Sequence, residues 1–477
     1  MWFQHYLAVM LRLQEKFEED GLWWLPDTPD RQVPGNFRFD QELGPTLSLA
    51  GLLRGLPESF KANRDERLLI HGVTRSGKRV TLLDCLNKSR QLQLPGICTE
   101  VYRAHIAAIG LNFKSSNEEL FHRSQFHFDG LEQWLVSRPF EVRHDPAARQ
   151  ISVMAIAPAE ELLVDLGDQQ LMAGSIAGMK DTKETQATIY SQSTLISIPH
   201  ELSSLEWHFE NAAQLQSLAT LTAGQHLPLT WIQVHGPEEE VGPGVRRVTT
   251  VDILAGMQHP TSARRVNDEP IVRWPEISTF SPDAVSRWFR MYEDLGSVIG
   301  IVLTLIAEER MFVNVRFLLA IQALEAFHRS VDATQLMNRT QHNELCEILI
   351  KAIPDGISRE MRDKLKGTLQ FTNEPSLRQR LRAILAGVAE RYGSTPAGFS
   401  KTFVSSLVDT RNYETHHTSE LKKKAFDNDG MYWASRRVLA LLVILLIERL
   451  GVAPAEIIKR LERHQEFFQL WHRGGVL

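Results

Sequence analysis

The residues best suited to do chemistry are the six from Arg411 to His416, which run Arg-Asn-Tyr-Glu-Thr-His. An arginine stays charged at any working pH and presents a rigid fork of N–H donors. It can therefore hold a phosphate and the negative charge that builds on it during attack. A histidine titrates near neutral pH, so it can take a proton from a ribose 2′-hydroxyl or give one to a departing 5′-oxygen. Together these groups can cut a phosphodiester without a metal ion, and the use of a 2′-hydroxyl points to RNA rather than DNA.

Arg411 and His416 do not complete a site if they lie on one helix. A helix turns by about 100° per residue, so these two side chains project about 140° apart. Asn412 is four residues before His416 and shares its face, while Arg411 lies at the edge of that face. Two such helices meeting across a twofold axis would bring both sets of side chains together. The spacing therefore favours a composite site at the interface of a homodimer or a higher even-numbered homo-oligomer.

Several neighbours of this motif are candidates for supporting roles. His417 fits a looser spacing from Arg411 and remains a rival of His416 for the proton transfer. Glu420 is four residues after His416 and could accept the second N–H of its imidazole on a continuous helix, although an exposed carboxylate is the commoner role. Three basic residues that follow are interpreted either as contacts to RNA phosphates or as a solvated loop: Lys422, Lys423 and Lys424.

The motif and three further stretches resemble a known family. RNYETH in a late helix resembles the R-polar-x3-H motif of HEPN-domain ribonucleases, which favours His416 over His417 as the catalytic histidine. Residues 316–329, 371–382 and 21–39 are similar to the ApeA group of antiphage HEPN proteins. The resemblance implies an RNA-cutting, toxin-like effector of abortive infection behind a non-catalytic N-terminal region. It also implies that Arg411, Asn412 and His416 are the catalytic residues and that the substrate is a structured RNA such as tRNA.

The leading hypothesis is a homodimeric, metal-independent endoribonuclease without a cofactor, leaving 2′,3′-cyclic phosphate and 5′-hydroxyl ends. A phage-encoded protein is a candidate trigger, sensed by the N-terminal region. One alternative is a catalytically silent HEPN-like scaffold that dimerises and binds a partner or a nucleotide. Another is a carbohydrate- or peptide-binding β module fused to a helical adaptor, suggested by several tryptophans that are more commonly core residues: Trp23, Trp24, Trp134, Trp207 and Trp231.

The distribution of proline divides the chain, because sixteen of the twenty-one prolines precede residue 281. Before that point short apolar runs alternate with turn residues, which is typical of strands. From Asp283 onward apolar residues recur at helical spacing. We therefore predict an α+β protein with a strand-rich domain over 1–280 and a HEPN-type bundle of five or six helices over 281–477, with 438–450 as the central helix. Residues 259–282 are predicted to connect the domains, and 173–188 and 235–247 to form mobile surface loops.

Three other features are predicted to be structural rather than catalytic. Gly72 to Lys78 has the spacing of a phosphate-binding P-loop, but Arg79 stands where a magnesium-binding hydroxyl should be and a strand pattern follows, which predicts a hairpin turn. Glu325 is expected to pair with Arg329 one helical turn later, although a supporting role at the site stays open. His328 lies on the apolar face of the same helix and is predicted to be a core histidine.

Bulk properties limit the class of protein. Three scattered cysteines argue against a disulfide framework or a zinc site and favour a reducing compartment, the cytoplasm. Residues 438–447 form the longest uncharged apolar run, too short for a membrane crossing of about twenty residues, and the partly apolar start (1–11) is expected to be a buried segment. The net charge of −5 argues against general coating of nucleic acid, so RNA contact is expected to be local.

Overall fold

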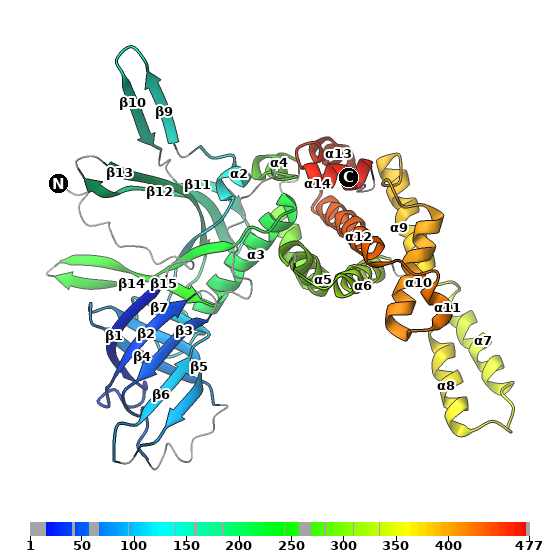
Figure 1. The fold of residues 1–477 in the computed structure, drawn as a ribbon, viewed down its shortest axis with the longest axis horizontal. Coiled ribbons are helices and arrows are strands. Elements are labelled where there is room, and N and C mark those ends of the chain that lie inside the picture. Colours follow the sequence, from blue (N-terminus) through cyan, green and yellow to red (C-terminus); the bar gives the residue numbers. More distant parts are fainter. Residues whose placement is uncertain are drawn as a thin grey trace. The chain divides into compact units, whose positions relative to one another are not determined.

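The structure is a computed structural model that describes residues 16–473 apart from 41–42, 57–65, 94, 139, 157–159, 184–185, 243, 257–268, 281–282, 309 and 333. The predicted buried segment at 1–11 lies outside these residues. Contacts divide the chain into a strand-rich unit (Met1–Ala223, Leu227–Asn267 and Arg273–Pro275) and a helical unit (Gly224–His226, Asp268–Val272 and Glu276–Leu477). Figure 1 shows strands in the first and helices in the second, which confirms the predicted α+β class.

Six strands of the first unit close on themselves. They pair antiparallel in the order β6-β5-β4-β1-β2-β3, and β3 pairs again with β6. The six strands therefore form a closed barrel, in which each strand has a partner on both sides. Several of their side chains are fully buried, among them Trp23, Phe37 and Leu47. The bounds of these strands are Phe17–Trp24 (β1), Val33–Asp40 (β2), Gly44–Leu49 (β3), Leu68–Thr74 (β4), Arg79–Gln91 (β5) and Thr99–Arg103 (β6).

The P-loop-like sequence forms the turn between β4 and β5. The Thr74 N–H donates to the Lys78 carbonyl over 2.9 Å, and Gly77 takes a positive φ of 83° that favours glycine. Because β5 follows instead of a helix, no helix N-terminus is present to receive a phosphate. The predicted hairpin turn is confirmed.

A further set of strands continues the same sheet from β5 through β7-β15-β14-β8-β13-β12-β11. Helix α3 (Leu205–Ala223) packs on β14, β8 and β13, and the short helix α2 (Leu131–Leu135) packs beside α3. The strands are Ile106–Ile109 (β7), Arg123–Phe128 (β8), Glu161–Asp165 (β11), Gln169–Lys183 (β12), Gln186–Pro199 (β13), Leu229–Gly242 (β14) and Val245–Ala255 (β15). A separate hairpin is formed by β9 (Phe140–Asp145) and β10 (Gln150–Ala155).

In their described residues, which exclude 184–185 and 243, the two stretches predicted as loops (173–188 and 235–247) form long paired strands. Small residues allow close pairing in β12, where Gly178 faces Tyr190 of β13 and a Cβ would collide with the tyrosine ring. In β14 the charge run faces opposite charges, with Glu239 across from Arg247 and Glu240 across from Arg246. The Glu238 Oε2 lies 3.9 Å from the Arg246 Nη1, and Glu239 pairs with Arg79 of β5 over 2.7 Å. Opposite charges on neighbouring strands let a charged segment extend as a strand, so the loop prediction was wrong.

Most of the tryptophans of this unit are core residues. Trp23, Trp134 and Trp231 are buried, and the Trp134 Nε1–H donates to the Thr222 hydroxyl over 2.9 Å. Trp24 and Trp207 are partly exposed. Core packing is therefore confirmed for three of the five residues behind the ligand-binding alternative.

The helical unit is built around α12, whose stretch from Val438 to Ile447 is entirely buried. It packs against α5, α6, α13 and α14, which confirms its predicted central place. Among the described helices α12 alone is long and apolar enough to span a membrane, but 72% of its apolar window is buried inside the unit, as in a core helix. The helices are Trp274–Phe280 (α4), Ala284–Ala307 (α5), Val313–Val331 (α6), Arg339–Lys351 (α7), Arg359–Gln370 (α8), Leu377–Tyr392 (α9), Lys401–His416 (α10), Ser419–Lys422 (α11), Asn428–Arg449 (α12), Pro454–Leu461 (α13) and Gln465–His472 (α14).

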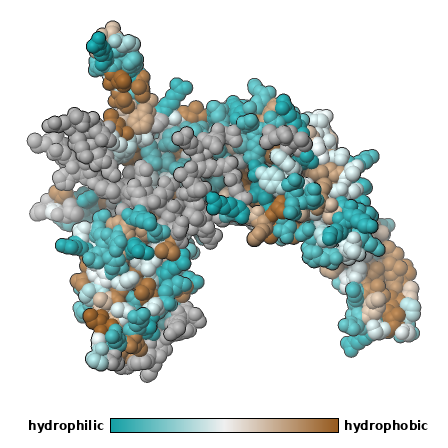
Figure 2. Space-filling view, viewed as in Figure 1, coloured by the Kyte–Doolittle hydropathy of each residue, from teal (hydrophilic) through white to brown (hydrophobic). Residues whose placement is uncertain are grey.

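The prediction of five or six helices was too low, since eleven helices lie between residues 269 and 473 in the described ranges. The additional ones are either short, as α11, α13 and α14 are, or have no buried residue, as is the case for α8. Helix α4 also lies inside the predicted connector, of which residues 259–268 fall outside the description. The α7–α8 pair exposes apolar side chains, among them Ile348 of α7 at 64% and Phe371, just after α8, at 68% exposure. Figure 2 shows apolar side chains gathered over this pair of helices.

Candidate functional site

The Arg-Asn-Tyr-Glu-Thr-His motif forms the last turns of α10. The helix begins where the Ser400 hydroxyl accepts from the Phe403 N–H over 3.1 Å. It ends because His417 takes a left-handed conformation with φ of 52°, and the His417 N–H donates to the Tyr413 carbonyl over 2.7 Å. Buried side chains on the preceding turns hold α10 against its neighbours α6 and α9: Val404, Leu407 and Thr410.

The motif changes from partly buried to exposed along its length. Arg411 and Asn412 are half-buried, and the Arg411 Nη1–H donates to the Asn412 Oδ1 over 3.2 Å. His416 is exposed, and its ring makes no hydrogen bond to any residue in the described part of the chain. Because Asn412 and His416 are one helical turn apart, they lie on one face of α10, as the spacing predicts.

Helix α6 supplies the acidic partner of the motif. The Glu325 Oε2 lies 3.8 Å from the Arg411 Nη2, and the Glu325 Oε1 lies 3.1 Å from the Arg329 Nη2. The predicted Glu325–Arg329 pair is therefore confirmed, and the same carboxylate also faces the motif arginine. This second contact could not be predicted from the sequence, because Glu325 and Arg411 are far apart along the chain.

The network extends to the N-terminal end of α9. Arg329 also contacts Glu374, whose Oε2 lies 3.2 Å from the Arg380 Nη2. Partial burial acts to lower the pKa of Arg329, but the carboxylates of Glu325 and Glu374 outweigh it and raise that pKa. Glu374 and Arg380 lie in the stretch 371–382 that the resemblance singles out, although no role for them was predicted.

His328 is a buried residue of the same region. It is 4% exposed, and burial together with the charge of Arg380 lowers its pKa, although Asp332 opposes this shift. Its Nδ1 lies 3.3 Å from the Arg380 Nη1. The predicted core position of His328 is confirmed.

Glu420 does not have the helical relationship to His416 on which its supporting role was based. Because α10 ends at His416, Glu420 lies on the separate short helix α11 and is exposed. A spacing of four residues brings side chains together only on a continuous helix. The spacing argument for a supporting role therefore does not apply, and the exposed position agrees with the commoner role of a solvated carboxylate.

The three lysines lie just past the motif in an anchored segment. Lys422 ends α11, Lys423 and Lys424 follow it, and all three are exposed. The segment is fixed to α10 because the Phe426 N–H donates to the Thr410 hydroxyl over 2.8 Å. Positive charge is thus kept close to the end of α10 that carries His416, on a turn rather than on a free loop.

Groups that could hold a metal ion do not gather in the described ranges, where no three His, Cys, Asp or Glu side chains come together. The three cysteines are free thiols, and Cys85 is fully buried. Burial raises the pKa of the Cys85 thiol, and the nearby Asp84 adds to the effect. Thiolate chemistry at Cys85 is therefore disfavoured.

Two family models match the chain. The model for ApeA N-terminal domain 1 matches residues 18–265, more than half of the chain, and the model for Apea-like HEPN matches residues 318–456. This chain belongs to the ApeA-like HEPN proteins of antiphage defence. In this ApeA-like protein the HEPN match contains the motif, the ion pairs around Glu325 and the three lysines. The chain is a HEPN effector with a strand-rich N-terminal domain. No curated protein matches the chain.

Proposed function

We propose that this ApeA-like protein is a metal-independent endoribonuclease in which Arg411 holds the scissile phosphate and His416 transfers the proton. The observation that carries the proposal is the arrangement of the last turns of α10. There the exposed imidazole of His416 lies on the same helix face as Asn412, which is half-buried and accepts a hydrogen bond from Arg411. A fixed guanidinium stabilises charge on the phosphate, and an imidazole exchanges protons near neutral pH. The products carry a 2′,3′-cyclic phosphate and a 5′-hydroxyl, and the substrate is a structured RNA such as tRNA.

His416 is the better of the two histidines for this role. His417 is the left-handed residue that ends α10, and its ring meets the Tyr413 ring edge-on at 5.6 Å between centroids. His416 remains in the helix and shares the face of Asn412. The conformation of His417 thus favours a role in ending the helix.

One copy of α10 supplies a single imidazole and a single guanidinium, so the proposal includes a homodimer or a higher even-numbered assembly with two motifs in one cleft. The exposed apolar side chains of α7 and α8 are of the kind that associating surfaces carry, and they support self-association. The three free cysteines support a cytoplasmic site of action. The N-terminal domain is proposed to restrain the nuclease until it meets a phage-encoded trigger.

A second candidate is a catalytically silent scaffold, favoured by the ion pair between Arg411 and Glu325, which would make the arginine structural. Purified protein incubated with total RNA in EDTA separates the two functions. The samples are the wild type, His416→Ala, Arg411→Ala, His417→Ala and, as a control, the exposed Arg359→Ala. The ribonuclease proposal expects cutting by the wild type, the control and His417→Ala, and loss in the other two. Cutting that persists in both variants, or that requires magnesium, overturns it.

A further inference from the structure

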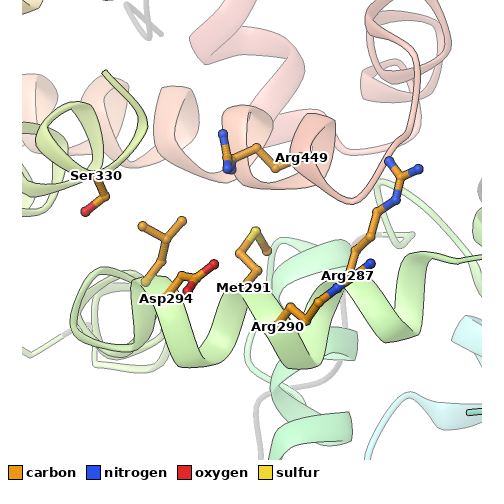
Figure 3. Close-up of a pocket in the computed structure, with 7 residues that line it drawn as sticks. Arg287, Arg290, Met291, Asp294, Ser330 and Arg449 are labelled. Atoms are coloured by element: carbon orange, nitrogen blue, oxygen red, sulfur yellow. The ribbon is translucent and has the colours of Figure 1, made fainter. Parts of the chain in front are cut away.

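A cavity of about 530 Å³ lies within the helical unit, away from the motif residues, between α5, the last turn of α6 and the end of α12. Figure 3 shows Arg449 of α12 facing Arg290, Met291 and Asp294 of α5 across this space. Arg287 lies at one end of the cavity and Ser330 of α6 at the other. Its volume is in the range of roughly 300–1,000 Å³ that small-molecule sites occupy.

Three guanidinium groups line this cavity without acidic partners. In the described ranges neither Arg287, Arg290 nor Arg449 has a hydrogen bond or ion pair from its side chain, whereas Arg391 on nearby α9 is paired with Glu448. Asp294 is the one carboxylate among the lining residues, so the lining carries an excess of positive charge. Like charges held around one concave space repel, and a bound anion relieves that repulsion.

The helix dipole of α12 explains the position of Arg449 only in part. A cation at the last residue of a helix is stabilised by the helix dipole, and Arg449 is the last residue of α12. That effect operates wherever the side chain points. It does not account for the two further arginines of α5 that line the same cavity, an arrangement that like-charge repulsion opposes.

The remaining lining residues restrict the kind of anion. Met291 and Leu295 are buried at 6% and 3% exposure and give the cavity an apolar wall. The Ser330 hydroxyl donates to the Ala326 carbonyl over 3.1 Å, which leaves its oxygen as an acceptor, and the Asp294 carboxylate is a second acceptor of the lining. A fitting ligand therefore combines phosphate groups, a flat apolar part and hydrogen-bond donors such as hydroxyl or amino groups.

We propose that this cavity binds a nucleoside di- or triphosphate, with its phosphates on Arg287, Arg290 and Arg449. The base lies against Met291 and Leu295, and sugar hydroxyls or base amino groups donate to Asp294 and Ser330. Single-stranded RNA fits less well, because its sites stack bases on aromatic side chains and none of the lining residues is aromatic. The proposal is independent of RNA cutting, since no lining residue belongs to the motif.

The test measures binding to the full-length protein by fluorescence anisotropy with a labelled ATP and a labelled GTP. Unlabelled ATP, adenosine, inorganic triphosphate and a short single-stranded RNA are the competitors. Arg449→Gln and the double variant Arg287→Gln/Arg290→Gln are compared with Arg449→Lys, which keeps the charge, and with Arg359→Gln on the exposed face of α8. Thermal melting checks that each variant is folded.

We expect a labelled nucleotide to bind, ATP to compete better than adenosine or inorganic triphosphate, and affinity to fall about 10- to 100-fold when a phosphate-binding guanidinium is lost. Arg449→Lys should lose less than Arg449→Gln, and Arg359→Gln should match the wild type. Three results would overturn the proposal: no nucleotide binding at millimolar concentration, equal binding by the wild type and the glutamine variants, or competition by RNA or inorganic triphosphate as strong as by ATP.

Discussion

The carboxylate of Glu325 lies 3.8 Å from the guanidinium of Arg411, so the arginine proposed to hold the scissile phosphate already faces a negative charge. The Arg411 side chain is 37% exposed, and ion pairs at such partly exposed sites contribute about 1 kcal/mol or less. A phosphate can therefore compete for Arg411. Glu325 sets the direction of the arginine and at the same time weakens its hold on RNA.

The first prediction concerns the charge of Glu325. Glu325→Gln keeps the size of the side chain and removes the charge that competes with phosphate. We expect the KM for RNA to fall about two- to fivefold, the change that roughly 0.5–1 kcal/mol produces, with kcat nearly unchanged. Glu374→Gln is the matched control, because Glu374 contacts Arg329 and Arg380 rather than Arg411. A fall in kcat as large as that of Arg411→Ala would show that the carboxylate is required for catalysis.

The second prediction concerns the lysines after the motif. Replacement of Lys422, Lys423 and Lys424 by glutamine removes three charges from a turn anchored beside α10. Each phosphate contact to single-stranded nucleic acid contributes about 0.7 to the slope of log affinity against log salt, so we expect the slope to fall by up to about two. RNA binding at several salt concentrations measures it. Lys351→Gln/Lys364→Gln, on the exposed surfaces of α7 and α8, should leave the slope unchanged.

The sequence predicts those parts of the fold that depend on local pattern. The apolar run 438–447 is sufficient to place α12 in the core, and the alternation before residue 281 is sufficient to predict strands. The strand pair β14–β15 was missed because Glu239 and Glu240 resemble a solvated loop until Arg246 and Arg247 are found across from them. Opposite charges on paired strands are a relationship between two segments, which the composition of either one does not contain.

The same limit applies to the candidate site. The spacing of Asn412 and His416 is local and correctly gives one face of α10, whereas the end of the helix at His416 depends on the left-handed conformation of His417. Glycine adopts that conformation readily and is the usual residue at a helix end, whereas histidine is not. The residue type at position 417 therefore does not predict that the helix ends there. The spacing argument that related Glu420 to His416 does not hold for that reason.

The third prediction concerns acid stability of the strand-rich unit. Burial lowers the pKa of His208 to about 4, and the nearby His122 adds to the shift against the Phe121 carbonyl. Above pH 6.5 His208 is neutral in both the folded and the unfolded chain, so it has no effect there. Between pH 6.5 and 4 the unfolded chain binds a proton that the folded chain does not, so stability falls as pH falls, by about 3 kcal/mol at most.

His208→Gln tests this dependence, because its amide can still donate to the Phe121 carbonyl, which lies 3.3 Å from the histidine Nε2. Thermal melting between pH 7.5 and 4.5 should show a smaller loss of Tm for this variant than for the wild type. His144→Gln, on exposed β9, should follow the wild type. Parallel pH curves for His208→Gln and the wild type would contradict the prediction.

The last prediction concerns where the helical unit can be separated from the N-terminal domain. A fragment starting at residue 281 removes Glu276, whose Oε1 lies 2.5 Å from the Arg463 Nη1 and 3.3 Å from the Arg460 Nε. Arg460 is 8% exposed and also pairs with Glu456, so the shorter fragment would lose one of its carboxylate partners. Weaker pairing of a buried charge is destabilising, so the fragment 281–477 should melt below the fragment 268–477.

The longer fragment keeps this carboxylate, so it is the one to use for testing whether the N-terminal domain restrains the nuclease. If that domain silences the nuclease, cells expressing 268–477 should lose viability faster than cells expressing the full chain at equal protein level. His416→Ala in the same fragment should restore growth, which ties toxicity to the motif rather than to misfolding. A folded, dimeric 268–477 fragment that is no more toxic than the full chain would contradict the proposed restraint. The ribonuclease proposal would be unaffected, because the RNA-cutting experiment tests it separately.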